Sequence, residues 1–143
     1  MKGIFKPTNP KKYKGNSSNI HYRSSWELKL MQRLDRDPRF IQWQSEEVVV
    51  PYRSPVDKRI HRYYPDFIVW TVNNEVMMVE VKPHKETMPP MLAEGKKMTA
   101  AHKKAVITYA INQKKWAAAR AYCADRLWQF KIFTEYELGI KKP

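Results

Sequence analysis

The chain has 143 residues, 43% of them hydrophobic and 29% charged, which is typical of one folded domain with a buried core. No apolar run approaches the ~20 residues of a membrane-spanning helix, so no membrane partner is expected. The single cysteine, Cys123, excludes a disulfide within the chain.

The net charge of +13 is unevenly distributed along the sequence. Residues 1–24 contain six Lys or Arg and no acidic residue, and residues 25–93 contain ten residues of each sign. Residues 94–143 contain eleven basic and four acidic residues. Two basic flanks around a neutral centre favour a polyanionic partner, most simply nucleic acid. Good solubility and a lipid surface are the alternatives.

Taken in order, the sequence predicts a basic flexible arm over residues 1–22 and a single domain over residues 23–143. A helix begins at Ser24 or Ser25, which can cap it, and ends near Asp35. The later elements are strands at 47–52, 63–72, 76–82 and 128–134 and a helical segment at 96–126, in which a break would fall near Asn112. The order α-β-β-β-α-β predicts a mixed α/β fold with helices flanking a central mixed sheet.

The strand MMVEVKPHK, residues 77–85, carries a carboxylate and an ammonium group on one face. Side chains two residues apart leave a strand on the same side, so Glu80 and Lys82 point in the same direction. An exposed strand end would also explain this pair, because charged side chains are mostly solvated.

The preceding strand, in YYPDFIVW, begins with Asp66. If the hairpin loop holds three residues, Asn73 to Glu75, then Asp66 lies opposite Lys82 and on the face of Glu80. A two-residue loop would move Asp66 to the other face of the sheet. Convergence of Asp66, Glu80 and Lys82 therefore requires an odd loop or a bulge.

A third carboxylate comes from the first predicted helix. In SSWELKLMQRLDRDP, Glu27 falls inside the apolar arc that is formed by Trp26, Leu30, Met31 and Leu34. An inward carboxylate is costly unless it is paired, protonated or bound to a metal. A buried ion pair or a role at the helix N-terminus would also account for this position.

These residues have the chemistry of a divalent-cation site. Carboxylate oxygens are the preferred ligands of Mg²⁺ and also suit Mn²⁺. Asp66, Glu80 and the Val81 carbonyl can hold one ion, and Glu27 can share it or complete a second site. Such an ion can activate water and neutralise phosphate charge. Lys82 can orient the attacking water or stabilise the developing negative charge.

The same residues resemble the motif of the PD-(D/E)xK nuclease superfamily, with Pro65-Asp66, thirteen intervening residues, and Glu80-Val81-Lys82. The stretch YRSSWE…QWQSEEVVVPY…HRYYPDF…VEVKP is similar to the catalytic domain of TnsA-type transposon endonucleases. Almost the whole chain, including NPKKYKGN, KWAAARAYC and TEYELGIK, resembles the head-completion nucleases of large contractile-tailed phages.

The resemblance implies a restriction-endonuclease-like αβββαβ core, with Asp66 and Glu80 as metal ligands, Lys82 as the catalytic lysine and Glu27 as the helical acid. It implies a metal-dependent endonuclease that acts on double-stranded DNA in filled phage heads before the tails join. The host cytoplasm is the implied location, with the virion head as a further one and portal or head proteins as further partners. The alternatives are a non-catalytic DNA-end plug of the phage neck and a junction resolvase of the same superfamily.

Basic residues outside the motif are candidates for binding the DNA backbone, although a solvated helix face would explain several of them. No pattern suggests contacts to base edges, so little sequence specificity is expected. The candidates are Lys11, Lys12, Lys14, Arg23, Arg53, Lys58, Arg59, Lys103, Lys104, Lys114 and Lys115.

Overall fold

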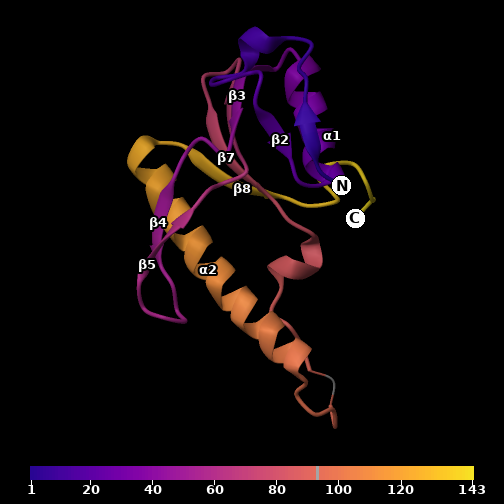
Figure 1. Ribbon diagram of the computed structural model, residues 1–143, viewed down its shortest axis with the longest axis vertical. Helices are drawn as coiled ribbons and strands as arrows, with labels where there is room; N and C mark the ends of the chain where they lie inside the picture. Colours follow the sequence, from indigo (N-terminus) through magenta and orange to yellow (C-terminus); the bar gives the residue numbers. More distant parts are fainter. Residues whose placement is uncertain (93) are drawn as a thin grey trace.

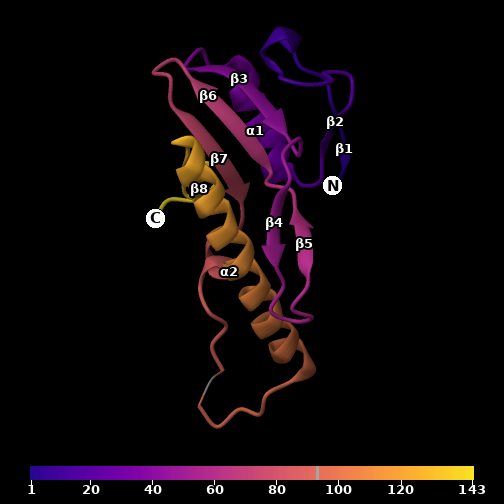
Figure 2. The same ribbon diagram turned by 90° about the vertical axis from the view of Figure 1, so that its left-hand side faces the viewer.

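The computed structural model describes residues 1–92 and 94–143, in which a four-stranded sheet lies between two α-helices (Figures 1 and 2). The elements are β1 (Gly3–Phe5), the 3-10 helix η1 (Pro10–Lys12), β2 (Ile20–Tyr22), α1 (Ser25–Arg36), β3 (Phe40–Ser45), β4 (Val50–Arg53), β5 (Ile60–Tyr63), β6 (Phe67–Thr71), β7 (Val76–Val81), the 3-10 helix η2 (His84–Thr87), α2 (Ala100–Arg126) and β8 (Gln129–Phe133). Neither α-helix of the described residues has the length and apolar composition needed to cross a lipid bilayer.

The central sheet has the strand order β3-β6-β7-β8. Strand β6 is antiparallel to both β3 and β7, and β8 is parallel to β7. Parallel neighbours need a long crossover connection, which α2 provides. Apart from the β4–β5 hairpin, the chain runs α1-β3-β6-β7-α2-β8 from the first helix onward. The prediction of a mixed α/β fold with two helices and a mixed central sheet is confirmed.

Each face of the sheet has its own core, because successive strand residues point to opposite sides. Phe67 and Val79 pack on the α1 side, together with Trp43 and the apolar residues of α1. Ile68 and Met78 pack on the α2 side, where the other core cluster includes residues of α2 and of the β4–β5 hairpin. Figure 2 shows the two helices on either side of the sheet.

The first strand of the central sheet was not anticipated from the sequence. The strand expected at 47–52 overlaps β4, which pairs with β5 in a separate two-stranded hairpin. The strand that pairs with β6 is β3. Its polar glutamines concealed it, yet Gln44 is buried and its amide donates a hydrogen bond to the Lys14 carbonyl oxygen at 3.1 Å. Burial beneath the N-terminal segment is thus compatible with these polar side chains.

The N-terminal segment, residues 1–22, differs from the flexible arm that its composition predicted. β1 and β2 form an antiparallel hairpin, and Phe5, Tyr13 and Ile20 belong to the core on the α1 side. Two backbone N–H groups of the segment donate hydrogen bonds to the buried Asp35 carboxylate, at 2.8 and 2.9 Å. The apolar residues are widely spaced among lysines, so the segment has the composition of an arm and the packing of a core element.

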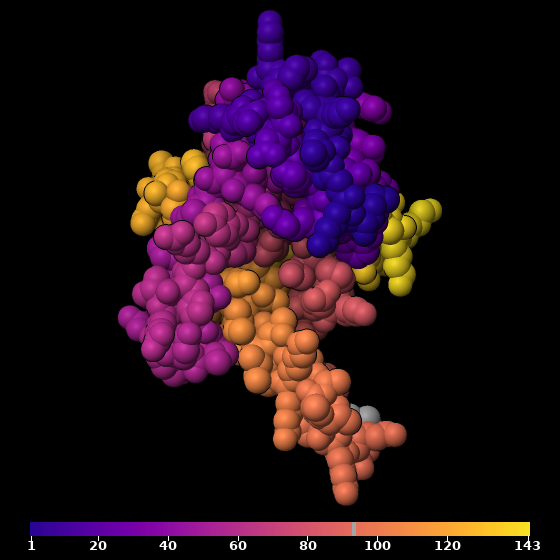
Figure 3. All heavy atoms as spheres, viewed as in Figure 1, coloured from indigo at the N-terminus to yellow at the C-terminus, as the bar shows by residue number. Residues whose placement is uncertain are grey.

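Helix α2 is continuous through Asn112, where a break would have fallen, and Asn112 is buried. The helix begins at Ala100, four residues later than expected, with the Thr99 side chain as its N-cap. Its first turns extend beyond the sheet in Figure 1 and protrude from the body of the molecule in Figure 3. The later part packs on the sheet through Trp116, Ala119 and Cys123.

The β6–β7 hairpin brings the predicted site residues to one end of the sheet. Trp70 pairs with Val76, so the loop is two residues longer than the three-residue loop considered from the sequence. The Thr71 hydroxyl accepts hydrogen bonds from two backbone N–H groups of the loop, which stabilises the longer turn. The longer loop is still odd. Continuing the register past Phe67 and Val79 therefore places Asp66 opposite Glu80, whereas the sequence placed it opposite Lys82.

Candidate metal centre

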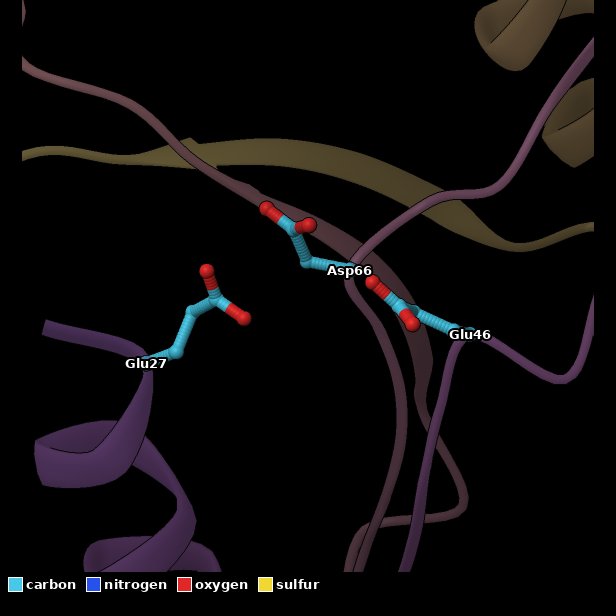
Figure 4. A group of neighbouring side chains, drawn as sticks. All are labelled: Glu27, Glu46 and Asp66. Carbon is cyan, nitrogen blue, oxygen red and sulfur yellow. The ribbon is translucent and has the colours of Figure 1, made fainter. Parts of the chain in front are cut away.

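Three carboxylates from separate elements meet at this end of the sheet. They belong to Glu27, Glu46 and Asp66, and one oxygen of each lies within 4.8 Å of the others. Glu27 lies in the first turn of α1, Glu46 directly follows β3, and Asp66 directly precedes β6. Figure 4 shows the three side chains gathered around a common space. Carboxylate clusters of this kind supply the oxygen ligands that hard divalent cations prefer.

The position of Glu27 is fixed by the start of α1. The Ser24 hydroxyl accepts a hydrogen bond from the Glu27 N–H at 3.1 Å and donates one to Glu27 Oε2 at 3.3 Å. This N-terminal capping therefore exists, as one alternative from the sequence proposed, and the same carboxylate also lies beside Asp66. Burial raises the pKa of Glu27 more than its hydrogen bonds lower it.

Glu46 was not among the candidates from the sequence. Its φ of 56° lies in the left-handed region, and its N–H donates a hydrogen bond to the Asp66 carbonyl oxygen at 3.3 Å. The Arg23 guanidinium donates to both carboxylate oxygens of Glu46, at 2.9 and 3.0 Å. Arg23, a candidate for DNA binding, thus forms an ion pair at the edge of the centre. The signal present in the sequence was an acidic pair, Glu46-Glu47, directly before the apolar run Val48–Val50.

Asp66 lies at the middle of the centre. Its Oδ2 accepts a hydrogen bond from the Val81 N–H at 2.8 Å, which ties the start of β6 to the end of β7. The pKa of Asp66 is raised well above its ordinary value, first by burial and then by the nearby Glu80 carboxylate. Two carboxyl groups this close need a proton or a cation between them.

Glu80 is buried on the α2 side of the sheet, with 6% of its surface exposed. It is adjacent to Asp66, but it is not one of the three carboxylates whose oxygen atoms lie within 4.8 Å of one another. Lys82 is the first residue after β7, is half-buried, and donates its N–H to the Phe133 carbonyl oxygen at 3.0 Å. Strand alternation continues to place its side chain on the face of Glu80.

The donor set fits a divalent cation. The centre offers hard oxygen atoms from four carboxylates, those of Glu27, Glu46, Asp66 and Glu80. Among the described residues, the only ion pair at this centre is that of Arg23 with Glu46. The raised pKa values of Glu27 and Asp66 reflect negative charge and burial that a bound cation would relieve. Oxygen ligands of this type suit Mg²⁺ and Mn²⁺.

The predicted DNA-binding cations divide into two groups. Several are engaged within the protein: the Lys12 ammonium donates to the carbonyl oxygens of Asp35 and Asp37, and Arg53 donates to the Lys58 carbonyl oxygen. Lys14 lies over the Trp70 ring, Lys58 donates to the Pro55 carbonyl oxygen, and Lys115 faces the rings of Tyr52 and Tyr63. The exposed candidates outside these contacts are Lys11, Arg59, Lys103, Lys104 and Lys114.

Comparison with known proteins identifies two similarities. Residues 37–135 match the family described as TnsA-like endonuclease N terminal. The chain is also 35% identical to the head completion nuclease of Enterobacteria phage T4 over 137 residues, which cover 93% of this chain and 90% of that protein. The family match includes Glu46, Asp66, Glu80 and Lys82, whereas Glu27 precedes it.

Proposed function

Because the chain belongs to the family of TnsA-like endonucleases, we propose that it is a metal-dependent endonuclease that hydrolyses phosphodiester bonds of double-stranded DNA. The observation that carries this proposal is the convergence of Glu27, Glu46 and Asp66 beside Glu80. Each of these carboxylates comes from a different segment of the chain. Their approach costs electrostatic energy without a cation, and such strain is typical of functional sites.

In this mechanism Asp66 and Glu80 hold the cation, together with Glu27 and Glu46 and with the Val81 carbonyl oxygen. Mg²⁺ or Mn²⁺, when bound, lowers the pKa of water and offsets charge on the phosphate. Lys82 orients the attacking water or stabilises the negative charge that develops on the phosphate. Arg23, at the rim, can exchange its contact with Glu46 for a phosphate oxygen.

The proposed biological setting rests on the similarity to the phage head completion nuclease. The similarity extends over almost the whole of both chains, which favours a shared place in phage head completion. We propose that this protein acts on or near packaged DNA before tail attachment, in the host cytoplasm or on the head, with portal or head proteins as partners. The exposed lysines favour contacts to phosphates, which carry little sequence information.

Plasmid nicking tests the proposed function. The purified chain is incubated with supercoiled and linear plasmid in Mg²⁺, in Mn²⁺ or in EDTA. We expect metal-dependent cleavage by the wild type, and a loss of more than about 100-fold in Asp66→Asn, because removal of a ligand should exceed the 10–100-fold cost of an outer-shell change. Asparagine preserves the side-chain oxygen that accepts from the Val81 N–H.

Glu75→Gln is the matched control, since Glu75 is an exposed carboxylate at the far end of the same hairpin. It should cleave at the wild-type rate. Wild-type cleavage by Asp66→Asn would reject the mechanism. DNA binding without cleavage in either metal would reject the endonuclease and favour the DNA-end plug. Preference for branched over linear DNA would instead favour the junction resolvase.

A further inference from the structure

Glu80 differs from the other carboxylates of the centre in how it is held. Its Oε2 accepts a hydrogen bond from the Tyr63 hydroxyl at 2.7 Å and another from the Trp116 indole Nε1–H at 3.1 Å. Both donors bind the same oxygen, so neither occupies Oε1. One oxygen is therefore fixed by these two donors, and neither of them binds the other oxygen, which lies in a carboxylate beside Asp66.

The two donors come from different elements of the core on the α2 side. Tyr63 ends β5 and Trp116 lies on α2, and both are buried, with 4% and 1% of their surfaces exposed. Packing locks the rings, so their polar atoms have fixed positions. The orientation of the Glu80 carboxylate is thereby determined by the packing of α2 and of the β4–β5 hairpin against the sheet.

Both donors are neutral, which preserves the negative charge of Glu80. The Tyr63 hydroxyl carries no charge and donates the hydrogen bond to Glu80. None of the ion pairs among the described residues includes Glu80. The Lys115 ammonium, on the same helix, instead faces the rings of Tyr52 and Tyr63 at 5.8 and 5.7 Å.

A cationic partner would cancel the charge of a buried carboxylate, and desolvating such an ion pair costs free energy. Neutral donors orient the group without cancelling its charge, as the outer-shell partners of metal-bound carboxylates do. Because Glu80 lies beside Asp66, its negative charge is available at the proposed cation site.

We infer that Tyr63 and Trp116 are positioning residues that orient the Glu80 carboxylate for a divalent cation, given the endonuclease function proposed above, on which this role rests. They touch neither the cation nor the DNA. Their effect should appear in the affinity of the centre for metal and leave the binding of DNA unchanged.

The test compares Tyr63→Phe and Trp116→Phe with the wild type. Calorimetric titration with Mn²⁺ in the absence of DNA measures metal affinity, and the Mg²⁺ concentration for half-maximal nicking is measured separately. Each variant should weaken Mn²⁺ affinity by about 10–100-fold and raise the Mg²⁺ requirement in parallel. DNA affinity in EDTA should equal that of the wild type.

Tyr52→Phe is the matched control, because Tyr52 is buried in the same core on β4, the strand that pairs with β5, and its hydroxyl takes no part in the Glu80 contacts. Its Mn²⁺ affinity should be unchanged. Trp116→Phe removes volume, so circular dichroism must confirm its fold, whereas Tyr63→Phe removes one oxygen atom and keeps the shape. Wild-type Mn²⁺ affinity in a folded Tyr63→Phe protein would overturn the positioning role. Absence of wild-type cleavage with Mn²⁺ binding intact would overturn the endonuclease alone.

Discussion

Two tyrosine–tryptophan pairs lie on opposite faces of the central sheet, and they use their polar atoms differently. On the α1 side, the Tyr13 and Trp43 rings meet edge to face at 4.8 Å, and the Tyr13 hydroxyl bonds the backbone of Ser45. The buried Trp43 Nε1 has no hydrogen-bond partner among the described residues. On the α2 side, Tyr63 and Trp116 both direct their donors to Glu80.

The two pairs show two different roles for buried aromatic residues: packing in the core, and orientation of another side chain. A buried indole can contribute through area alone and leave its N–H unpaired, as Trp43 does, at a cost of about 1–3 kcal/mol. Two donors that converge on one carboxylate oxygen are a more specific arrangement. We therefore assign the α1-side pair to the fold, where it attaches the N-terminal segment to β3, and the α2-side pair to the metal centre.

The first test asks whether the metal centre depends only on residues of the α2 side or also on a carboxylate that follows β3. Glu46→Gln tests this, because Glu46 follows β3 and approaches Asp66 from the other edge. Loss of a charged ligand should raise the Mg²⁺ requirement for nicking by at least about 100-fold, more than the positioning variants do. Titration of nicking against Mg²⁺ concentration measures the effect.

The control for this change is Glu47→Gln. Glu47 is the neighbouring residue, and its carboxylate accepts a hydrogen bond from the Tyr13 hydroxyl at 3.1 Å, so it belongs to the α1-side pair. Its Mg²⁺ requirement should remain at the wild-type value. A wild-type Mg²⁺ requirement in Glu46→Gln, equal to that of Glu47→Gln, would show that Glu46 is not part of the metal centre.

Tyr13→Phe tests the α1-side pair. The change removes the acceptor of the buried Ser45 N–H and should lower the free energy of unfolding by about 1–3 kcal/mol. The Mg²⁺ requirement should not change, in contrast to Tyr63→Phe. Urea unfolding in EDTA measures the stability, and a shifted Mg²⁺ requirement would show that the two faces are coupled.

The same variant should alter the response to alkaline conditions. Burial is the main reason that the pKa of Tyr13 is raised to about 12, whereas an unfolded tyrosine ionises near ~10. The folded state thus holds the proton longer, so this contribution to stability is intact below pH ~10 and is lost as the pH rises toward 12. Tyr13→Phe should show a smaller alkaline loss than the wild type. Tyr63, Tyr52 and Cys123, whose pKa values burial also raises, contribute to the loss that remains.

The sequence predicted the family and the shared face of Asp66 and Glu80, and it missed Glu46 and the strand β3 before it. The family resemblance is confirmed, and Asp66 and Glu80 are adjacent because an odd hairpin loop preserves the face of the sheet. The length of that loop depended on the Thr71 hydroxyl, a local turn contact that hydrophobic patterns do not reveal. The ligand roles of Glu27, Asp66, Glu80 and the Val81 carbonyl stay predictions, as does the catalytic role of Lys82.

The missed strand β3, the N-terminal segment and Glu46 share one cause, which is burial between segments that are distant in sequence. Strand β3 contains glutamines, and the N-terminal segment that covers it is rich in lysine, so each lacks the pattern of a core element alone. Together they bury Tyr13 and Trp43. Glu46 was missed for the same reason, because its role depends on β3 lying beside β6 and on the left-handed turn that follows β3.

The smallest expected effect concerns DNA affinity on the α2 side. Lys103 and Lys104 are exposed on the first turns of α2, whereas Lys12 on the α1 side is bound to backbone carbonyl groups. The double change Lys103→Gln/Lys104→Gln should reduce the slope of log affinity against log salt by up to ~1.8, or ~0.9 for each phosphate that the protein no longer neutralises. Fluorescence anisotropy in EDTA at several salt concentrations measures the slope. Lys131→Gln, at an exposed lysine of β8, should leave it unchanged. An unchanged slope in the double variant would place the DNA away from the first turns of α2 and leave Lys11, Arg59 and Lys114 as the candidates.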